Sequence, residues 1–224
     1  MLHNLKAVFF DLDGTLLDTA PDMAEALNIQ LEAHKKKPLP HSDIRPYVSH
    51  GAAALIKLGF DVTPEQAEFE ALRRQYLKIY SENLAHHTRP FDGISELLEA
   101  LERNKIKWGV VTNKPAFLTE PLLKQLDLYD RCSSVISGDT VTPSKPSPLP
   151  LFVACKDSQV IATQSIYVGD AKRDIAAGKA AGMKTILAHY GYIQPEDDIN
   201  QWGADWVVNH ASELQPLILN KAPL

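Results

Sequence analysis

VFFDLDGT, at residues 8–15, passes abruptly from apolar to acidic residues. The apolar run from Ala7 to Phe10 is rich in β-branched and aromatic residues, which predicts a short buried strand. Asp11 and Asp13 follow two residues apart, so their side chains lean to the same side at the end of the strand. Gly14 then allows the backbone to turn sharply. The stretch therefore predicts a strand that ends in a functional site.

From these residues alone, the acidic pair has three interpretations. Asp and Gly are common in loops, so Asp11 and Asp13 fit ordinary turn residues. A calcium-binding loop requires Gly at its sixth position and a Glu further on, whereas Gly14 comes fourth, so this interpretation fails on spacing. The third interpretation is a carboxylate pair that binds a hard cation and reacts with phosphorus. The rest of the chain has to decide between the first and the third.

Composition limits the class of protein. The chain has 224 residues, enough for one full domain and a small second one. Its 23 basic residues stand against 28 acidic ones, and no basic stripe dominates, so we expect no nucleic acid partner. Cys132 and Cys155 are far apart, which indicates neither a disulfide framework nor a zinc site and fits a reducing cytoplasm. No apolar run is long enough for a signal peptide or a membrane span, so we expect a soluble cytoplasmic protein without a membrane partner.

Helical patterns fill the region after the acidic stretch. Apolar residues recur at helical spacing behind Thr19, which predicts a helix capped by that residue. Thr63-Pro64-Glu65-Gln66 predicts the start of another helix, which runs to about Asn83. Residues 18–88 are therefore expected to form an all-helical domain inserted directly after the first strand.

From Phe91 onwards, helical patterns alternate with short apolar strands. The strands are expected at residues 108–112, 135–137, 166–168 and 185–188. Such alternation is typical of a parallel sheet with helices on both faces. We therefore predict an α/β fold, with a doubly wound, Rossmann-like core of residues 1–17 and 89–224 and the helical domain of residues 18–88. Ligands of such sheets bind at the carboxyl ends of the strands, where Asp11 lies.

Other polar residues stand where the core is expected to bind ligands. Thr112 and Asn113 end the second core strand and offer neutral phosphate-binding groups, although a strand residue and a helix cap fit the same positions. Lys145 stands between two prolines of a loop, where a loosely held surface lysine is less expected. Asp170 ends a later strand and Asp174 follows four residues on, although both acids also suit the first turn of a helix.

In this order, these residues resemble the four motifs of the haloacid dehalogenase superfamily, most of whose members are magnesium-dependent phosphatases. Asp11-Leu12-Asp13-Gly14-Thr15-Leu16 resembles the first motif, and Thr112, Lys145 and Gly169-Asp170 with Asp174 resemble the other three. The resemblance implies that Asp11 attacks phosphorus and forms an aspartyl-phosphate, while Asp13 protonates the leaving oxygen and then activates water. It implies phosphate binding by Thr112, Asn113 and Lys145. It also implies a Mg²⁺ site formed by Asp11, the backbone carbonyl of Asp13 and Asp170, with Asp174 and Gly169 in support.

The same residues bear on three other activities that this scaffold could have. Dehalogenases of the superfamily lack the second Asp, so Asp13 disfavours that chemistry. A sugar phosphomutase keeps all four motifs and stays possible. A non-enzymatic binding domain has no need for a complete set of nucleophile, acid and metal ligands.

The substrate is expected to be a small phosphorylated metabolite chosen by the inserted domain. Residues 44–51 resemble the cap motif of phosphoglycolate phosphatases but carry Ser49 where those enzymes typically have Gly. Residues 109–115, 190–197 and 202–205 look closer to the bacterial N-acetylmuramic acid 6-phosphate phosphatases of cell-wall recycling, which we take as the first hypothesis, with phosphoglycolate as the alternative. Arg45 is a candidate partner for a substrate carboxylate, although an exposed arginine on a solvated face fits equally. The roles of His50, His86 and His87 stay open, as does the choice between monomer and homodimer.

Overall fold

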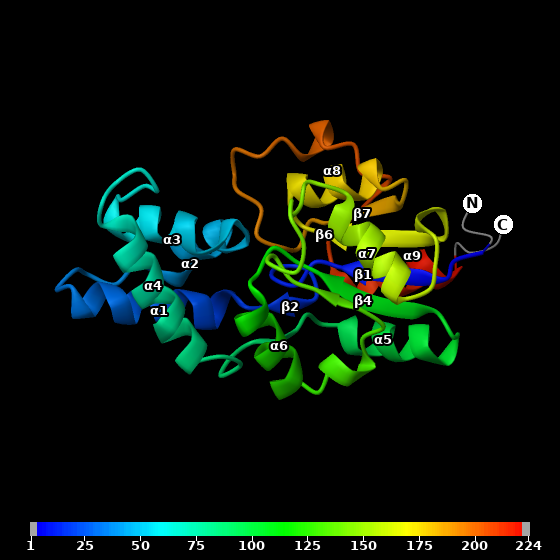
Figure 1. The fold of residues 1–224 in the computed structure, drawn as a ribbon, viewed down its shortest axis with the longest axis horizontal. Helices are drawn as coiled ribbons and strands as arrows, with labels where there is room; N and C mark the ends of the chain where they lie inside the picture. The colour runs from blue at the N-terminus through cyan, green and yellow to red at the C-terminus, as the bar shows by residue number, and fades with distance from the viewer. Residues whose placement is uncertain (1–3, 221–224) are drawn as a thin grey trace.

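The computed structural model describes residues 4–220. Its centre is a six-stranded parallel sheet in the order β5-β4-β1-β6-β7-β8 (Figure 1). The strands are β1 (Ala7–Phe10), β4 (Lys107–Val111), β5 (Val135–Ile136), β6 (Ser165–Gly169), β7 (Lys184–Ala188) and β8 (Trp206–Val208). The predicted doubly wound α/β fold is confirmed, and β8 is a strand that the sequence patterns did not indicate.

Side chains of β1 alternate between two apolar layers. Val8 and Phe10 pack with α5 (Ile94–Arg103), α6 (Ala116–Gln125) and α9 (Leu214–Asn220) on one face of the sheet. Ala7 and Phe9 pack with α7 (Leu149–Asp157) and α8 (Lys172–Ala180) on the other. All four residues are fully buried, as expected of a central parallel strand covered by helices on both faces.

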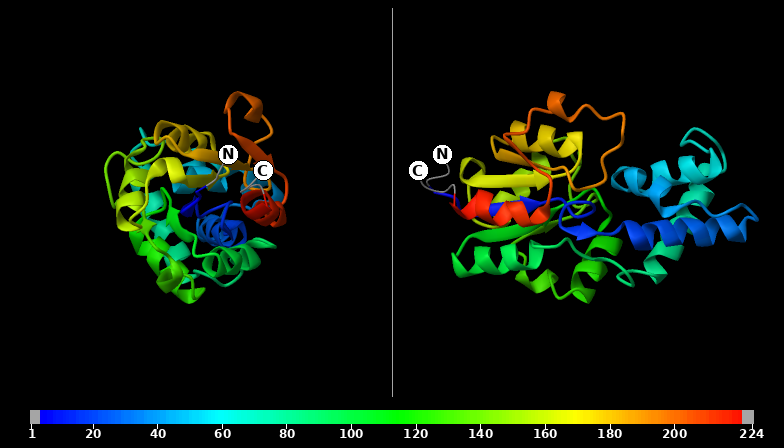
Figure 2. Two further views of the ribbon diagram at one scale, coloured as in Figure 1. Left: turned by 90° about the vertical axis from the view of Figure 1, so that its right-hand side faces the viewer. Right: turned by 180° about the vertical axis from the view of Figure 1, so that it is seen from behind.

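The segment between residues 18 and 88, which we call the inserted segment, lies beyond the carboxyl ends of the strands (Figures 1 and 2). Its helices pack around an apolar cluster that they form together with Leu118 and Tyr192 of the α/β core. They are α1 (Ala20–Ala33), α2 (His41–Ile44), the 3₁₀ turn η1 (Arg45–His50), α3 (Gly51–Phe60) and α4 (Phe69–Glu82). At its base, β2 (Leu17–Asp18) pairs antiparallel with β3 (Arg89–Pro90), so the chain enters and leaves the segment at one place.

Two helix starts differ from the local sequence signals. The helix expected from Thr63 begins only at Phe69, although the Gln66 side chain does accept a hydrogen bond from the Thr63 backbone N–H. Thr19 precedes α1, but its hydroxyl leaves the helix uncapped and donates to Asp13 instead. In both places a tertiary contact or a local turn outweighs the capping preference.

Four further 3₁₀ turns connect the core elements: η2 (Tyr129–Arg131), η3 (Ala162–Gln164), η4 (Ile199–Gln201) and η5 (Ala211–Glu213). Within residues 4–220, no helix combines the length and the apolar character needed to cross a membrane.

Candidate active site

Three carboxylates meet at the carboxyl edge of the sheet. Asp11 follows β1 and Asp170 follows β6, and because these strands pair in parallel, their ends bring the two side chains together. Asp174 joins them from the first turn of α8. Carboxylate oxygens of the three buried residues lie within 4.8 Å of one another. Gly169 permits this approach, since a Cβ at that position would collide with the Asp174 side chain.

The ammonium group of Lys145 bridges two of these carboxylates. Its Nζ atom lies 2.9 Å from Asp11 Oδ1 and 2.7 Å from Asp174 Oδ1. It also donates hydrogen bonds to the Val111 carbonyl and the Tyr167 hydroxyl. The side chain is fully buried, so Lys145 is held in place rather than free on the surface. A buried charge is tolerated where it is paired and hydrogen-bonded in this way.

The charges around Asp11 keep it ionised. Burial raises the pKa of its carboxyl group, but the nearby cations of Lys145 and Arg173 outweigh burial and hold the pKa below its usual value. Arg173 Nη2 lies 4.0 Å from Asp11 Oδ2. Asp11 is therefore an anion at neutral pH, which is the state that a nucleophilic carboxylate requires.

Asp170 has the properties of a cation ligand. Its burial, and next the charges of Asp11 and Asp174, raise the pKa of its carboxyl group to about 7. Its Oδ1 atom is buried and has no hydrogen-bond partner. A buried oxygen without a partner, beside two further carboxylates, is suited to a divalent cation that prefers oxygen ligands, such as Mg²⁺. The residues present therefore fit the metal that the first motif implies.

Asp13 is held by two residues that the sequence patterns did not single out for this role. Its Oδ1 atom accepts a hydrogen bond of 2.6 Å from the Thr19 hydroxyl and lies 2.9 Å from Lys114 Nζ. Lys114 also donates to the hydroxyl of Tyr80, on α4, so this lysine links Asp13 to the inserted segment. Lys114 follows Thr112 and Asn113 directly, but nothing local marks it as buried, because its partners are distant in the sequence.

Thr112 and Asn113 lie at the end of β4, as predicted, but their side chains have different surroundings. Thr112 faces the site, and its hydroxyl accepts a hydrogen bond from the Lys114 backbone N–H. The Asn113 side chain is engaged twice by the Lys145 backbone, donating to its carbonyl and accepting from its N–H. The amide thus fixes the Lys145 loop while Asn113 also lines the cavity, and its contact with phosphate stays a prediction.

The inserted segment reaches the carboxylates through η1. The Ser49 hydroxyl donates a hydrogen bond of 2.5 Å to Asp170 Oδ2. Arg173 Nη2 donates to the Ser49 carbonyl at 2.7 Å. Two bonds at one residue therefore join the inserted segment to the edge of the sheet.

A cavity of about 420 Å³ lies between the inserted segment and this edge. The core lines it with Asp11, Asp13, Thr112, Asn113, Lys114, Pro115, Leu118 and Arg173, and the inserted segment lines it with Met23, Val48, Ser49, His50, Gly51, Ala52, Ala53, Arg73, Tyr76, Leu77 and Tyr80. The inserted segment thus contributes mostly apolar walls and a single arginine. Of the three histidines left open by the sequence, His50 lines the cavity, while His86 and His87 do not.

Arg45 lies outside this cavity. Its Nη1 atom pairs with Asp18 Oδ1 at 2.7 Å, and its guanidinium group lies over the ring of Tyr192, 4.7 Å from the centroid. Tyr192 in turn donates to Asp18 and accepts from the Ala20 backbone N–H. The expected contact between Arg45 and a substrate carboxylate does not fit this position, because the side chain turns toward the base of the inserted segment.

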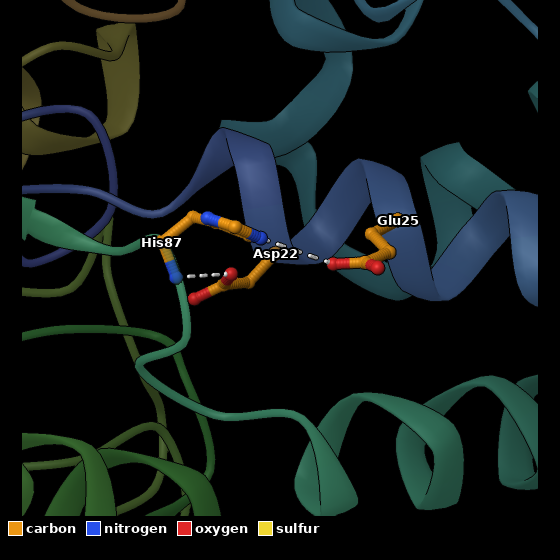
Figure 3. Close-up of side chains that lie close together, drawn as sticks. All are labelled: Asp22, Glu25 and His87. Carbon is orange, nitrogen blue, oxygen red and sulfur yellow. Dashed lines mark hydrogen bonds and ion pairs between the residues drawn. The ribbon is translucent and has the colours of Figure 1, made fainter.

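A second cluster of titratable groups lies at the same base (Figure 3). Asp22, on α1, accepts hydrogen bonds from the backbone N–H groups of His87 and Thr88 and from the Thr88 hydroxyl. The His87 ring lies 3.7 Å from Glu25 (Figure 3). Both oxygens of Asp22 are thus occupied by the linker into β3, and the cluster fastens that linker to α1.

A family model described as haloacid dehalogenase-like hydrolase matches residues 8–188. The chain belongs to this family. The match confirms the resemblance to the haloacid dehalogenase superfamily, and it covers most of the chain, including the segments that carry the four motifs.

Members of the family with similar sequences extend over nearly the whole chain. N-acetylmuramic acid 6-phosphate phosphatase of Pseudomonas putida is 44% identical over 214 residues, which is 96% of both chains. A phosphoglycolate phosphatase of Xanthomonas campestris is 43% identical over 209 residues, covering 93% of this chain and 94% of its own. The crystal structure of a predicted phosphoglycolate phosphatase from Haemophilus somnus aligns with a TM-score of 0.83 at 27% identity, covering 96% of this chain and 98% of that one.

This haloacid dehalogenase-like hydrolase is therefore a phosphatase, a hydrolase of phosphate monoesters. Its site contains an ionised carboxylate at a strand end, a buried lysine beside it and a cavity above it. Such an arrangement can hold a phosphoryl group and offset its negative charge.

Proposed function

We propose that the protein is a Mg²⁺-dependent phosphomonoesterase that forms an aspartyl-phosphate at Asp11 and acts on a sugar-acid phosphate. N-acetylmuramic acid 6-phosphate is the first candidate, and phosphoglycolate is the second. The observation that carries the proposal is the ionised Asp11 carboxylate, which is buried beside Lys145 and lines the cavity between the core and the inserted segment. The low cysteine content and the nature of the substrate are consistent with a cytoplasmic enzyme of cell-wall recycling, which is part of the proposal.

In the proposed reaction, a carboxylate oxygen of Asp11 attacks phosphorus, and the bond from phosphorus to the ester oxygen breaks. Asp13 gives its proton to the departing alcohol and then takes one from the water that cleaves the aspartyl-phosphate, which restores Asp11 and releases phosphate. Lys145 offsets the charge of Asp11 and of the phosphoryl oxygens throughout. The Thr112 hydroxyl, which faces the same cavity, is the proposed neutral partner of the phosphoryl group.

The proposed Mg²⁺ site uses Asp11, the Asp13 backbone carbonyl and Asp170, with Asp174 holding Lys145 in place. The bound cation supplies positive charge that allows an anionic nucleophile to approach an anionic phosphoryl group. The unpartnered Oδ1 atom of Asp170 supports this assignment.

We further propose that residues 18–88 act as a cap domain over a core of residues 1–17 and 89–224. The apolar cluster of the inserted segment, to which the α/β core adds Leu118 and Tyr192, and the segment's single place of entry and exit support this division. Most of the cavity wall remote from the carboxylates comes from this segment, so its side chains are in a position to select the substrate.

The size and chemistry of the cavity favour the larger candidate. Cavities of about 300 to 1,000 Å³ hold ligands much larger than a two-carbon acid, and this one has about 420 Å³. Its outer wall includes the apolar side chains of Val48 and Leu77, which can pack against an acetyl group and the carbon atoms of a sugar ring. A small acid would not reach them and would leave water beside them. Arg73 is the one arginine that the inserted segment contributes to the lining, so it replaces Arg45 as the proposed partner of the substrate carboxylate.

The substrate proposal predicts a higher kcat/KM for N-acetylmuramic acid 6-phosphate than for phosphoglycolate. Contacts of the sugar with the apolar wall contribute binding energy that the small acid cannot use, because it leaves most of the cavity unfilled. Phosphate release with both esters in the presence of Mg²⁺ measures the ratio. A clear preference for phosphoglycolate would overturn the substrate assignment and leave the phosphatase assignment standing.

Replacing Arg73 with Gln is expected to lower kcat/KM for N-acetylmuramic acid 6-phosphate by about tenfold to a hundredfold, since a charge-assisted hydrogen bond contributes about 1.5 to 3 kcal/mol. N-acetylglucosamine 6-phosphate lacks the lactyl carboxylate, so its kcat/KM should stay within about twofold.

Arg74→Gln is the matched control, because Arg74 is the next residue of α4 but is exposed and does not line the cavity. Equal losses on both sugar phosphates after Arg73→Gln would contradict recognition of the carboxylate by Arg73.

A further inference from the structure

Ser49 is the point at which the inserted segment contacts a proposed metal ligand. Its hydroxyl donates to Asp170 Oδ2 across a separation of 121 residues in the sequence. The only other hydrogen bond to Asp170 among the described residues comes from the Tyr192 backbone N–H, and it also goes to Oδ2. Oδ1 is left buried and without a partner. The two donors therefore hold Oδ2 and leave Oδ1 as the oxygen of this carboxylate that is free to bind a cation.

A hydrogen bond from the core holds the backbone of Ser49 in place. Arg173 Nη2 donates to its backbone carbonyl at 2.7 Å, and the arginine comes from the turn of α8 that follows Asp170. Gly51, with a φ of +71°, ends the η1 turn immediately afterwards. A side-chain bond to Asp170 and a backbone bond from Arg173 thus hold one residue of the inserted segment against the strand end.

Groups that hydrogen-bond to a metal ligand set its orientation and its affinity for the cation, and their loss typically weakens metal binding about tenfold to a hundredfold. Here one of the two belongs to the inserted segment, whose helices share most of their apolar contacts with one another and whose chain enters and leaves at β2 and β3.

We propose that Ser49 is a positioning residue through which the inserted segment orients Asp170. Mg²⁺ binding and the packing of the inserted segment against the core then favour each other. The inference rests on the proposed Mg²⁺-dependent function. Linkage makes the effect reciprocal. Packing of the segment against the core raises the affinity for the cation, and bound cation favours the packed state by the same factor. A glycine at this position has no hydroxyl and therefore lacks the coupling.

The first test is calorimetric titration of Mg²⁺ into metal-free protein, with the cation alone as the ligand. Ser49→Ala is expected to raise the Kd for Mg²⁺ about tenfold or more. Ser49→Thr keeps a hydroxyl and is expected to retain most of the affinity. Ser42→Ala is the matched control, since Ser42 also lies in the inserted segment and donates to a carboxylate, that of Asp43, but is exposed and remote from the site. Equal melting temperatures of the metal-free proteins establish that Ser49→Ala acts on binding and not on folding.

The second test is hydrogen exchange of the backbone amides of η1, with and without Mg²⁺. In the unaltered protein and in Ser42→Ala, Mg²⁺ is expected to slow exchange in this turn. In Ser49→Ala the slowing at saturating Mg²⁺ is expected to disappear, which a purely local structural role would not produce.

The outcomes separate the inference from the proposed function. Unaltered protein that binds no Mg²⁺ would overturn both. Unaltered protein that binds Mg²⁺, with Ser49→Ala binding it within about twofold as tightly, would overturn the coupling alone and leave the metal-dependent phosphatase intact.

Discussion

Asp11→Asn is expected to reduce turnover to the background rate while leaving the protein folded. The amide has nearly the shape of the carboxylate, and its oxygen can still accept the hydrogen bond that the Leu12 backbone N–H gives to Asp11. It has no anionic oxygen to attack phosphorus, so the aspartyl-phosphate cannot form. Loss of a catalytic nucleophile in other hydrolases lowers kcat by about six orders of magnitude, and a loss of about four orders or more is expected here.

Lys145 keeps a partner in this variant, because it also pairs with Asp174. The ammonium charge of Lys145 therefore stays paired in Asp11→Asn, and the melting temperature should shift only modestly. Asp130→Asn is a control for the loss of one acid, since Asp130 is exposed and distant from the cavity lining. Phosphate release and thermal unfolding measure the two effects separately. Retention of even a tenth of the original turnover would show that Asp11 is not the nucleophile.

Removal of divalent cations is expected to abolish turnover reversibly. The site places the carboxylates of Asp11, Asp170 and Asp174 beside two cations, Lys145 and Arg173, so a phosphate dianion enters a region without surplus positive charge. A bound divalent cation contributes several kcal/mol of stabilisation to the developing charge, equivalent to about a thousandfold or more in rate.

The measurement is phosphate release after treatment with EDTA and again after excess MgCl₂ is restored. A sample that receives EDTA already saturated with Mg²⁺ controls for effects of the chelator itself. Added Mg²⁺ should also raise the melting temperature of the metal-free protein, because a ligand of the folded state alone stabilises that state. Full turnover in metal-free buffer would rule out the proposed role of the cation.

Short-range patterns in the sequence were sufficient for the sheet and the strand-end acids. β1 is fully apolar and stops at Asp11, and β6 repeats this design at Asp170, so each strand end could be predicted without knowledge of the other. Parallel pairing then brings the two acids together as a consequence of the fold. The short strand β8 lacked such a signal, because it has only three residues and one of them is exposed.

Residues whose roles depend on distant partners were not predictable in the same way. Lys114 and Ser49 are ordinary polar residues in their local contexts, and their partners Tyr80 and Asp170 are fixed only by how the inserted segment sits on the core. Arg45 shows the converse, since its chemistry suited a substrate carboxylate but its side chain points to Asp18. Residue type predicts what a side chain can bind, whereas its direction comes from the tertiary structure.

The pairing of Asp18 with Arg89 at the base of the inserted segment has a consequence for the order of folding. To pair β1 with β4, the chain must first bring together points on either side of this long insertion, and closing a flexible loop of that length costs about 4 kcal/mol in entropy. Helices that assemble early through the apolar contacts they make with one another would bring Asp18 and Arg89 together and replace the flexible loop with a compact one. The inserted segment is therefore expected to act as an early folding unit that helps the central sheet to form, in addition to covering it afterwards.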